Sequence, residues 1–122
     1  APATLESTDR HIDARRIVVR LKAESKTLEH LEASTGVYAT LEGDYEAKSD
    51  TLRYDAATDL WVFEGRPVEM RAPDRERGGC VHTTGGQLAE INARTRTVVW
   101  PTIAANRQIR HDPTWDCSKS IR

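Results

Sequence analysis

Two cysteines and two of the four histidines form a group of side chains that could bind a transition metal, and the two cysteines could also form a covalent cross-link. Cys80 and His82 are separated by one residue, and His111 and Cys117 follow near the C-terminal end. Thiolate and imidazole groups in this number could bind zinc, but Cys-x-His is an unusual ligand spacing. We therefore expect no metal. The two cysteines could pair in an oxidising compartment or stay as two thiols in a reducing one.

The sequence contains none of the motifs that position a nucleophile, a phosphate or a catalytic metal. It lacks Gly-x-Ser-x-Gly, the phosphate-binding Gly-Lys-Ser/Thr, His-Glu-x-x-His and a dinucleotide fingerprint. Asp and Glu are plentiful, but nothing in their spacing places two carboxylates in one cleft. We therefore expect no enzyme activity, no catalytic residue and no cofactor.

Composition predicts one globular domain without a nucleic-acid partner. The chain has 122 residues, and its 18 Lys and Arg nearly balance its 19 Asp and Glu. A nucleic-acid binder normally has a clear basic excess. The basic group Arg15, Arg16, Arg20 and Lys22 could bind phosphates. Its preferred interpretation is a solvent-exposed strand face, because acidic residues elsewhere cancel its charge.

A strand-pair pattern that occurs twice predicts the elements that must position these side chains. Residues 52–65 fit a strand, a turn on Asp55 with a Thr three residues later, and a return strand. Residues 88–101 repeat this arrangement with Asn92 at the turn. Asp and Asn favour such turns because their side chains bond the backbone two residues further along. Apolar runs on both sides make each copy a hairpin, and repeated hairpins must stack to bury their faces.

A shorter theme also recurs, at a spacing of about 35 residues, which is within the range of stacked repeats. It is a small residue, two further positions, and then Leu or Ile. Its three copies are Ala14-x-x-Ile17, Ser49-x-x-Leu52 and Gly85-x-x-Leu88.

These patterns predict an all-β, antiparallel fold. Strands are expected near residues 11–22, 35–42, 45–54, 60–64, 67–72, 86–91 and 97–103. A bend is expected near Arg15 and Arg16, because Ile12 and Ile17 lie on opposite parities of the first strand. Residues 24–32 are expected to form a loop that leads into a strand near 31–33.

The predicted domain spans residues 11–103. Residues 1–10 are expected to be a flexible N-terminus, because they are polar. Residues 104–122 are expected to be an irregular C-terminal tail, because they have little periodicity.

Part of this pattern resembles the OstA-like domain, which builds the periplasmic bridge proteins of lipopolysaccharide transport and part of their outer-membrane partner. The matching positions of its strand-turn-strand motif are Leu52, Tyr54, Asp55, Thr58, Gly65 and Val68. Ile12-Asp13-Ala14 resembles the family's opening strand, and Gly36-Val37 resembles a Gly-x-Val that recurs after it. The resemblance covers roughly residues 11–103. The charged segment 24–32 and the cysteine-bearing tail depart from it.

The resemblance implies an open β-jellyroll, in which a V-shaped antiparallel pair of sheets carries the acyl chains of lipopolysaccharide in an apolar interior. The candidate lipid-binding residues are those of the apolar strand faces: Ile17, Val19, Leu21, Val37, Ala39, Leu41, Leu52, Tyr54, Val68 and Met70. The alternative interpretation of the same residues is an ordinary closed core. The implied location is the periplasm, with attachment to the inner or outer membrane through partners. In that compartment Cys80 and Cys117, the only two cysteines, are expected to form a disulfide.

The resemblance also implies docking to related β-jellyroll domains and head-to-tail self-association, since exposed edge strands invite strand addition. The expected function is a non-enzymatic scaffold that shields lipopolysaccharide and relays it toward the outer membrane. The alternative is a β-rich interaction module of the cell envelope that uses its edge strands and carries no lipid. The two differ in whether the apolar face is open from end to end or filled by large side chains.

Overall fold

The computed structural model describes residues 3–41, 45–73, 78–100, 110–115 and 121. Every regular element in these residues is a β-strand, which confirms the predicted all-β class. The strands are β1 (Ala3–Ser7), β2 (Arg10–Ala14), β3 (Arg16–Leu21), β4 (Leu28–Leu41), β5 (Tyr45–Asp55), β6 (Leu60–Pro73), β7 (Cys80–Asn92), β8 (Thr97–Val99) and β9 (Arg110–Trp115).

The strands form one open antiparallel sheet. Its order is β1-β2-β4-β5-β6-β7-β8, with β3 paired to β4 and β9 paired to β7. Strands β2 and β3 therefore pair with different stretches of β4. In the same way, β8 and β9 pair with different stretches of β7. This arrangement is consistent with the predicted open β-jellyroll.

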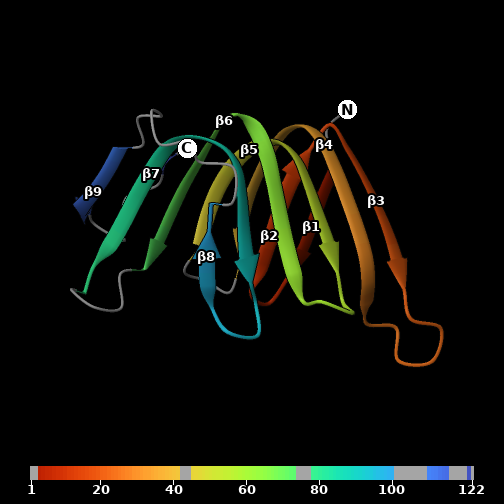
Figure 1. The fold of residues 1–122 in the computed structure, drawn as a ribbon. Coiled ribbons are helices and arrows are strands. Elements are labelled where there is room, and N and C mark those ends of the chain that lie inside the picture. The colour runs from red at the N-terminus through yellow and green to blue at the C-terminus, as the bar shows by residue number, and fades with distance from the viewer. Residues whose placement is uncertain (1–2, 42–44, 74–77, 101–109, 116–120, 122) are drawn as a thin grey trace.

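The four long strands β4 to β7 each bend where their pairing register shifts, and together these bends fold the sheet into two halves. Figure 1 shows the long strands arching over the top of the molecule. One half contains β3, β8 and the segments of the long strands that lie beside them, and we call it the β3/β8 half. The other contains β1, β2, β9 and the remaining segments, and we call it the β2/β9 half.

Glycine occupies two of the bends for physical reasons. Gly36, in β4, has a φ of +64°, a left-handed conformation that costs glycine little. At Gly65, in β6, a Cβ atom would lie 3.0 Å from the backbone nitrogen of Asp50 and 3.1 Å from the carbonyl oxygen of Pro67. The bend of β6 therefore requires the absence of a side chain at this position.

The two predicted Asx turns are confirmed. The Asp55 carboxylate accepts a hydrogen bond from the backbone nitrogen of Ala57 at 2.9 Å, and the Asn92 side-chain oxygen accepts one from that of Arg94 at 3.0 Å. The turns stack, because the backbone nitrogen of Ala93 donates to the carbonyl of Asp59 in the preceding turn at 2.9 Å. The β5–β6 and β7–β8 hairpins therefore lie side by side, as repeated units must if they are to bury a common face.

The core lies between the two halves, on the inner face of the folded sheet. Alternate residues of β2 and of the long strands point into it, and Trp61 and Phe63 of β6 are its largest side chains. Both are fully buried. In two copies of the shorter repeat, Ile17 and Leu52 both pair with Ala33 of β4. The three residues therefore form one cross-strand row on the inner face. The third copy differs from the other two, because its Leu88 is not a core residue and the next residue, Ala89, is.

Several predicted strand boundaries are wrong. Segments whose apolar and polar residues alternate only weakly nevertheless form strands, because a neighbouring strand completes their backbone hydrogen bonds. The expected flexible N-terminus contains β1, which pairs with β2 over its whole length. The expected loop 24–32 becomes strand from Leu28 onward, where β3 supplies the partner. The expected irregular tail contains β9, which pairs with β7.

One break expected between strands is also wrong. The predicted strands 60–64 and 67–72 are one strand, because Pro67 lies at a register shift, where a proline fits. The predicted strand 86–91 is longer than expected, since β7 begins at Cys80 and ends at Asn92. The bend expected near Arg15 is confirmed, since β2 ends at Ala14 and β3 begins at Arg16. Residues 101–103 of the last predicted strand lie outside the described residues.

Candidate functional site

Most of the predicted lipid-binding residues line the interior between the two halves. They belong to β4, β5 and β6, and all are buried: Val37, Ala39, Leu41, Leu52, Tyr54, Val68 and Met70. The interior is therefore apolar, and in this structure large side chains fill it. These residues form the main hydrophobic core of the fold, as the alternative interpretation of a closed core requires.

The three candidates on β3 are not enclosed in this way. Ile17 packs against the core, whereas Val19 is 42% exposed and Leu21 is 49% exposed. Val19 pairs with the fully buried Leu31 of β4, so its side chain lies on the inner face of the sheet. It is exposed because β3 is an edge strand whose only pairing partner among the described strands is β4. The interior therefore reaches solvent along β3.

Two residues of the β2/β9 half reach across the interior to the opposite half. Arg10 alternates with the buried Ile12, which places it on the inner face. Its guanidinium carbon lies 5.3 Å from the centroid of the Trp61 ring and 5.9 Å from that of Tyr54. The hydroxyl of Tyr45 donates a hydrogen bond to the backbone carbonyl of Arg96 at 2.9 Å.

These contacts lie at the ends of strands, away from the bend. Arg10 and Tyr45 begin β2 and β5, and Arg96 immediately precedes β8. We call this side of the molecule the mouth, and its residues are Arg10, Tyr45, Tyr54, Trp61 and Arg96. Sequence reasoning missed Arg10 as a site residue. Its position two residues before Ile12 would have indicated that both side chains lie on the same face of the strand.

The two rings at the mouth differ in their polar partners. Tyr54 and Trp61 pack with ring centroids 4.2 Å apart. The hydroxyl of Tyr54 donates to the Asp59 carboxylate at 2.9 Å. The indole nitrogen of Trp61 is buried and has no hydrogen-bond partner among the described residues. A buried donor of this kind is unusual, because most buried polar groups are satisfied.

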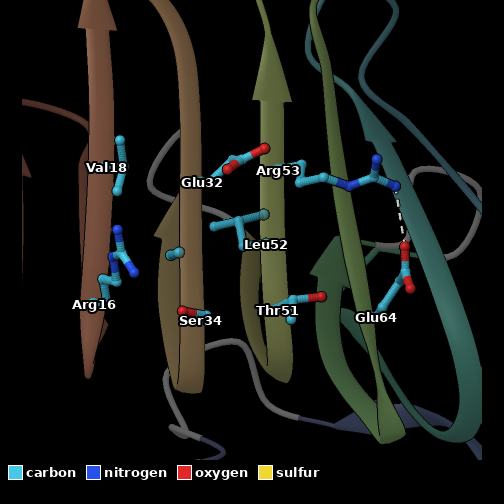
Figure 2. A pocket seen from close by; sticks show the side chains of 9 residues that line it. Arg16, Val18, Glu32, Ser34, Thr51, Leu52, Arg53 and Glu64 are labelled. Atoms are coloured by element: carbon cyan, nitrogen blue, oxygen red, sulfur yellow. Dashed lines mark hydrogen bonds and ion pairs between the residues drawn. The ribbon is translucent and has the colours of Figure 1, made fainter.

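A separate hollow of about 430 Å³ lies on the outer face of the β3/β8 half. Figure 2 shows its charged walls, which come from β3, β4, β5 and β6. Arg53 donates to Glu64 at 3.0 Å, but both side chains are more than half exposed. Such a pair contributes about 0–1 kcal/mol.

The hollow also holds Arg16 of the predicted basic group, and Arg20 of that group pairs with Glu29 at 3.2 Å. The sheet itself separates this charged hollow from the apolar interior. We therefore do not assign the functional site to it.

The outer face of the β2/β9 half carries a buried carboxylate that sequence reasoning also missed. Glu46 is 2% exposed. It accepts hydrogen bonds from the hydroxyl of Tyr38 and, at 3.0 Å, from the backbone nitrogen of Ile121, and it lies 3.1 Å from Arg71 Nε. This site ties the C-terminal end of the chain to the sheet.

Among the described residues, no group of three or more His, Cys, Asp or Glu side chains is placed so that it could hold a metal ion. Cys80 is buried and is not a free thiol. His82 instead bonds Glu69 at 2.7 Å. Cys117 lies outside the described residues, as does the side chain of His111, so the predicted Cys80–Cys117 pair stays a prediction.

A scan against models of known protein families finds no match to this chain, and a search of curated proteins finds none either. In the part of the chain that the structure describes, no helix is long and apolar enough to cross a membrane.

Proposed function

We propose that this protein is a non-enzymatic scaffold of the periplasm that shields the acyl chains of lipopolysaccharide and relays them toward the outer membrane. The chains occupy the interior between the two halves of the sheet. A related β-jellyroll domain, or a second copy of this chain, docks at a sheet edge and continues the apolar surface. No covalent step and no cofactor is involved.

One observation carries this proposal: the inner face is apolar across the sheet and reaches solvent at β3. One cross-strand row runs from β3 to β8 through Val19, Leu31, Tyr54, Trp61, Ile91 and Val98. Because Val19 is 42% exposed while Leu31 is fully buried, the row begins in solvent and continues into the core. An acyl chain entering at β3 would meet apolar side chains along this row.

A second candidate function is an interaction module that uses its edge strands and carries no lipid. The complete burial of Trp61 and Phe63 favours it, because these side chains fill the space that an acyl chain would need. Under the first function the two halves must separate when lipid binds. Under the second function they stay closed.

Photo-crosslinking at two neighbouring positions of β3 distinguishes the two functions. Val19 on the inner face and Val18 on the outer face are 42% and 45% exposed, so they are a matched pair. A benzophenone amino acid is placed at either position, and the full chain is irradiated with purified lipopolysaccharide. We expect a lipid adduct from position 19 that clearly exceeds the adduct from position 18.

Equal labelling at the two positions would mean non-specific surface contact and would contradict the lipid function. Absence of an adduct at both positions would also contradict it. If the chain then bound a related β-jellyroll domain without lipid, the interaction module would be supported.

A further inference from the structure

Strand β3 carries most of the large apolar side chains that are exposed in the described part of the chain. Val18, Val19 and Leu21 are three of the four such residues, and Val99 of β8 is the other. Single exposed apolar residues are normal, but a group of them on one surface marks an interaction site. Because β3 has only six residues, these three side chains make up half of it.

The same segment is strongly basic, although the chain as a whole is nearly neutral. Residues 15–29 contain five of the 18 Lys and Arg of the chain and only two of its 19 Asp and Glu. All five basic residues are exposed: Arg15, Arg16, Arg20, Lys22 and Lys26. Within the described ranges, Arg20 is the only one of the five with an ion-pair partner, Glu29 at 3.2 Å. That pair is exposed and weak, so most of the positive charge is uncompensated.

The apolar and the charged side chains of β3 lie on opposite faces of the strand. Val19 pairs with the buried Leu31, and Leu21 pairs with Leu28, which packs against the core, so both lie on the inner face. Arg20 lies between them in sequence and therefore on the outer face. β3 is thus an amphipathic strand, and its position at the edge of the sheet leaves both faces accessible.

The loop that joins β3 to β4 adds two cations beyond the end of the strand. Hydrogen bonds close this loop, from the backbone nitrogen of Lys22 to the carbonyl of Thr27 at 2.8 Å and from that of Lys26 to the carbonyl of Lys22 at 2.9 Å. Figure 1 shows the loop projecting past the ends of the neighbouring strands. Both lysines can therefore reach an extended surface that the rest of the sheet does not obstruct.

We propose that β3 and this loop, residues 15–29, form a contact surface for an anionic membrane. Val19 and Leu21 enter the boundary between head groups and acyl chains, while the basic side chains bind lipid phosphates. Amphipathic segments bind membranes through these two contributions, the buried apolar area and the attraction to anionic lipids. A nucleic acid would match the charge of the segment but would leave its apolar side chains in water.

This contact does not require the proposed lipid function. If both hold, the membrane contact places the side of the interior that reaches solvent along β3 against a bilayer. A strand added to β3 would cover the same side chains. Membrane contact and docking of another domain at β3 therefore exclude each other.

Co-sedimentation of the full chain with lipid vesicles tests the contact. Vesicles of phosphatidylcholine mixed with phosphatidylglycerol are compared with vesicles of phosphatidylcholine alone, and neither contains lipopolysaccharide. We expect the chain to bind the mixed vesicles and to bind the neutral ones far more weakly. Sodium chloride should weaken the binding, because it screens exposed charges.

A pair of double variants tests where the charge acts. Lys22→Gln with Lys26→Gln should weaken binding to the mixed vesicles about twentyfold, since each basic residue near an anionic surface contributes about fivefold. The control is Arg94→Gln with Arg96→Gln, which removes the same charge beside β8, at the opposite edge. Arg96 also matches the left-handed backbone of Lys26, with φ values of +57° and +58°. The control should weaken binding far less.

A third double variant tests the apolar part and keeps every charge. Val19→Thr with Leu21→Thr should weaken binding about tenfold, since each buried CH₂ group contributes about fourfold. Val99→Thr, at an exposed position of β8, is the control and should leave binding unchanged. Threonine is favoured in strands, so the fold should be kept. If the double variant loses its strand signal in circular dichroism, the charge variants decide.

The outcomes separate the membrane contact from the proposed function. Absence of binding to the mixed vesicles would overturn the contact and leave the lipopolysaccharide function untouched. Equal binding to neutral vesicles, or equal losses in the two charge variants, would also overturn it. Wild-type binding by Val19→Thr with Leu21→Thr would overturn it as well, because the attraction would then be one of charge alone. If the vesicle results hold but position 19 gives no lipopolysaccharide adduct, the contact stands and the proposed function fails.

Discussion

The buried carboxylate of Glu46, on the outer face of the sheet, is tolerated because it has specific partners. Removing a carboxylate from water costs several kcal/mol unless a counter-ion and hydrogen-bond donors replace the solvent. Arg71, Tyr38 and the backbone nitrogen of Ile121 provide them. The C-terminal end of the chain is therefore held where it completes the environment of a buried charge.

His11 predicts a pH dependence of stability. Its ring nitrogens lie 2.8 Å from Asp13 and 2.9 Å from Glu6, on the paired strands β2 and β1. The hydrogen bond to Asp13, followed by the one to Glu6, raises the pKa of His11 above its usual 6.5. A raised pKa means that the folded state favours the protonated ring. The resulting stabilisation is present below pH 6.5 and is lost as the pH rises through the folded pKa.

His11→Gln should remove this pH-dependent contribution. Urea-denaturation midpoints measured from about pH 5 to 8 should fall more steeply with pH in the wild type than in the variant. Asp13→Asn should flatten the wild-type curve more than Glu6→Gln does, since Asp13 is the larger cause. Parallel curves for the wild type and His11→Gln would show that the ring does not contribute in this way.

At the scale of the elements, the large apolar side chains that are exposed in the described part of the chain lie on edge strands. Val18, Val19 and Leu21 of β3 are each more than 40% exposed, and Val99 of β8 is 51% exposed. An apolar edge with unpaired backbone groups invites strand addition. Because β3 and β8 lie at opposite edges of the sheet, a contact between them does not close on itself and forms an open chain.

Val19→Lys should therefore weaken head-to-tail association. It places a charge on the inner face of the edge strand, where it would be buried in the junction. Val18→Lys, at a similar exposure on the outer face, is the control and should weaken association less. Both should change the free energy of unfolding by only about 0.5 kcal/mol, as exposed sites do. Sedimentation velocity over a concentration series measures the effect, and a wild type that stays monomeric at all concentrations would refute it.

At the scale of the whole molecule, the two halves are covalently and energetically coupled. Strands β4 to β7 run through both halves, and the inner faces share one core. Neither half can lose its strands without removing the packing of the other. The register shifts interrupt the regular pairing only at the bends between the halves.

This coupling predicts a single unfolding transition. In a protein with Trp100→Phe and Trp115→Phe, the fluorescence of Trp61 reports the core, and far-ultraviolet circular dichroism reports the whole sheet. Their urea midpoints should coincide. Adding Phe63→Ala should lower both midpoints together, by about 3–5 kcal/mol in free energy. A fluorescence transition that precedes the loss of strand signal would show instead that the halves separate before they unfold.

The sequence by itself determined the features that depend on local chemistry. The Asp55 and Asn92 turns were predictable because an Asx side chain bonds its own backbone within a few residues. The inner faces of β4, β5 and β6 were predictable because side chains alternate along a strand. The all-β class follows from these two signals.

Only the tertiary structure decided where strands lacking a local signal would pair and which apolar residues would be covered. The pattern of β1 and β9 is weak, and both become strands because β2 and β7 satisfy their backbones. Val19 has the same alternation as Val37, yet it is exposed because it lies at an edge. The meeting of Arg10 with Trp61 likewise depends on folding one half of the sheet over the other, which brings together residues far apart in sequence. No local pattern encodes that contact, because it depends on the register of the strands between them.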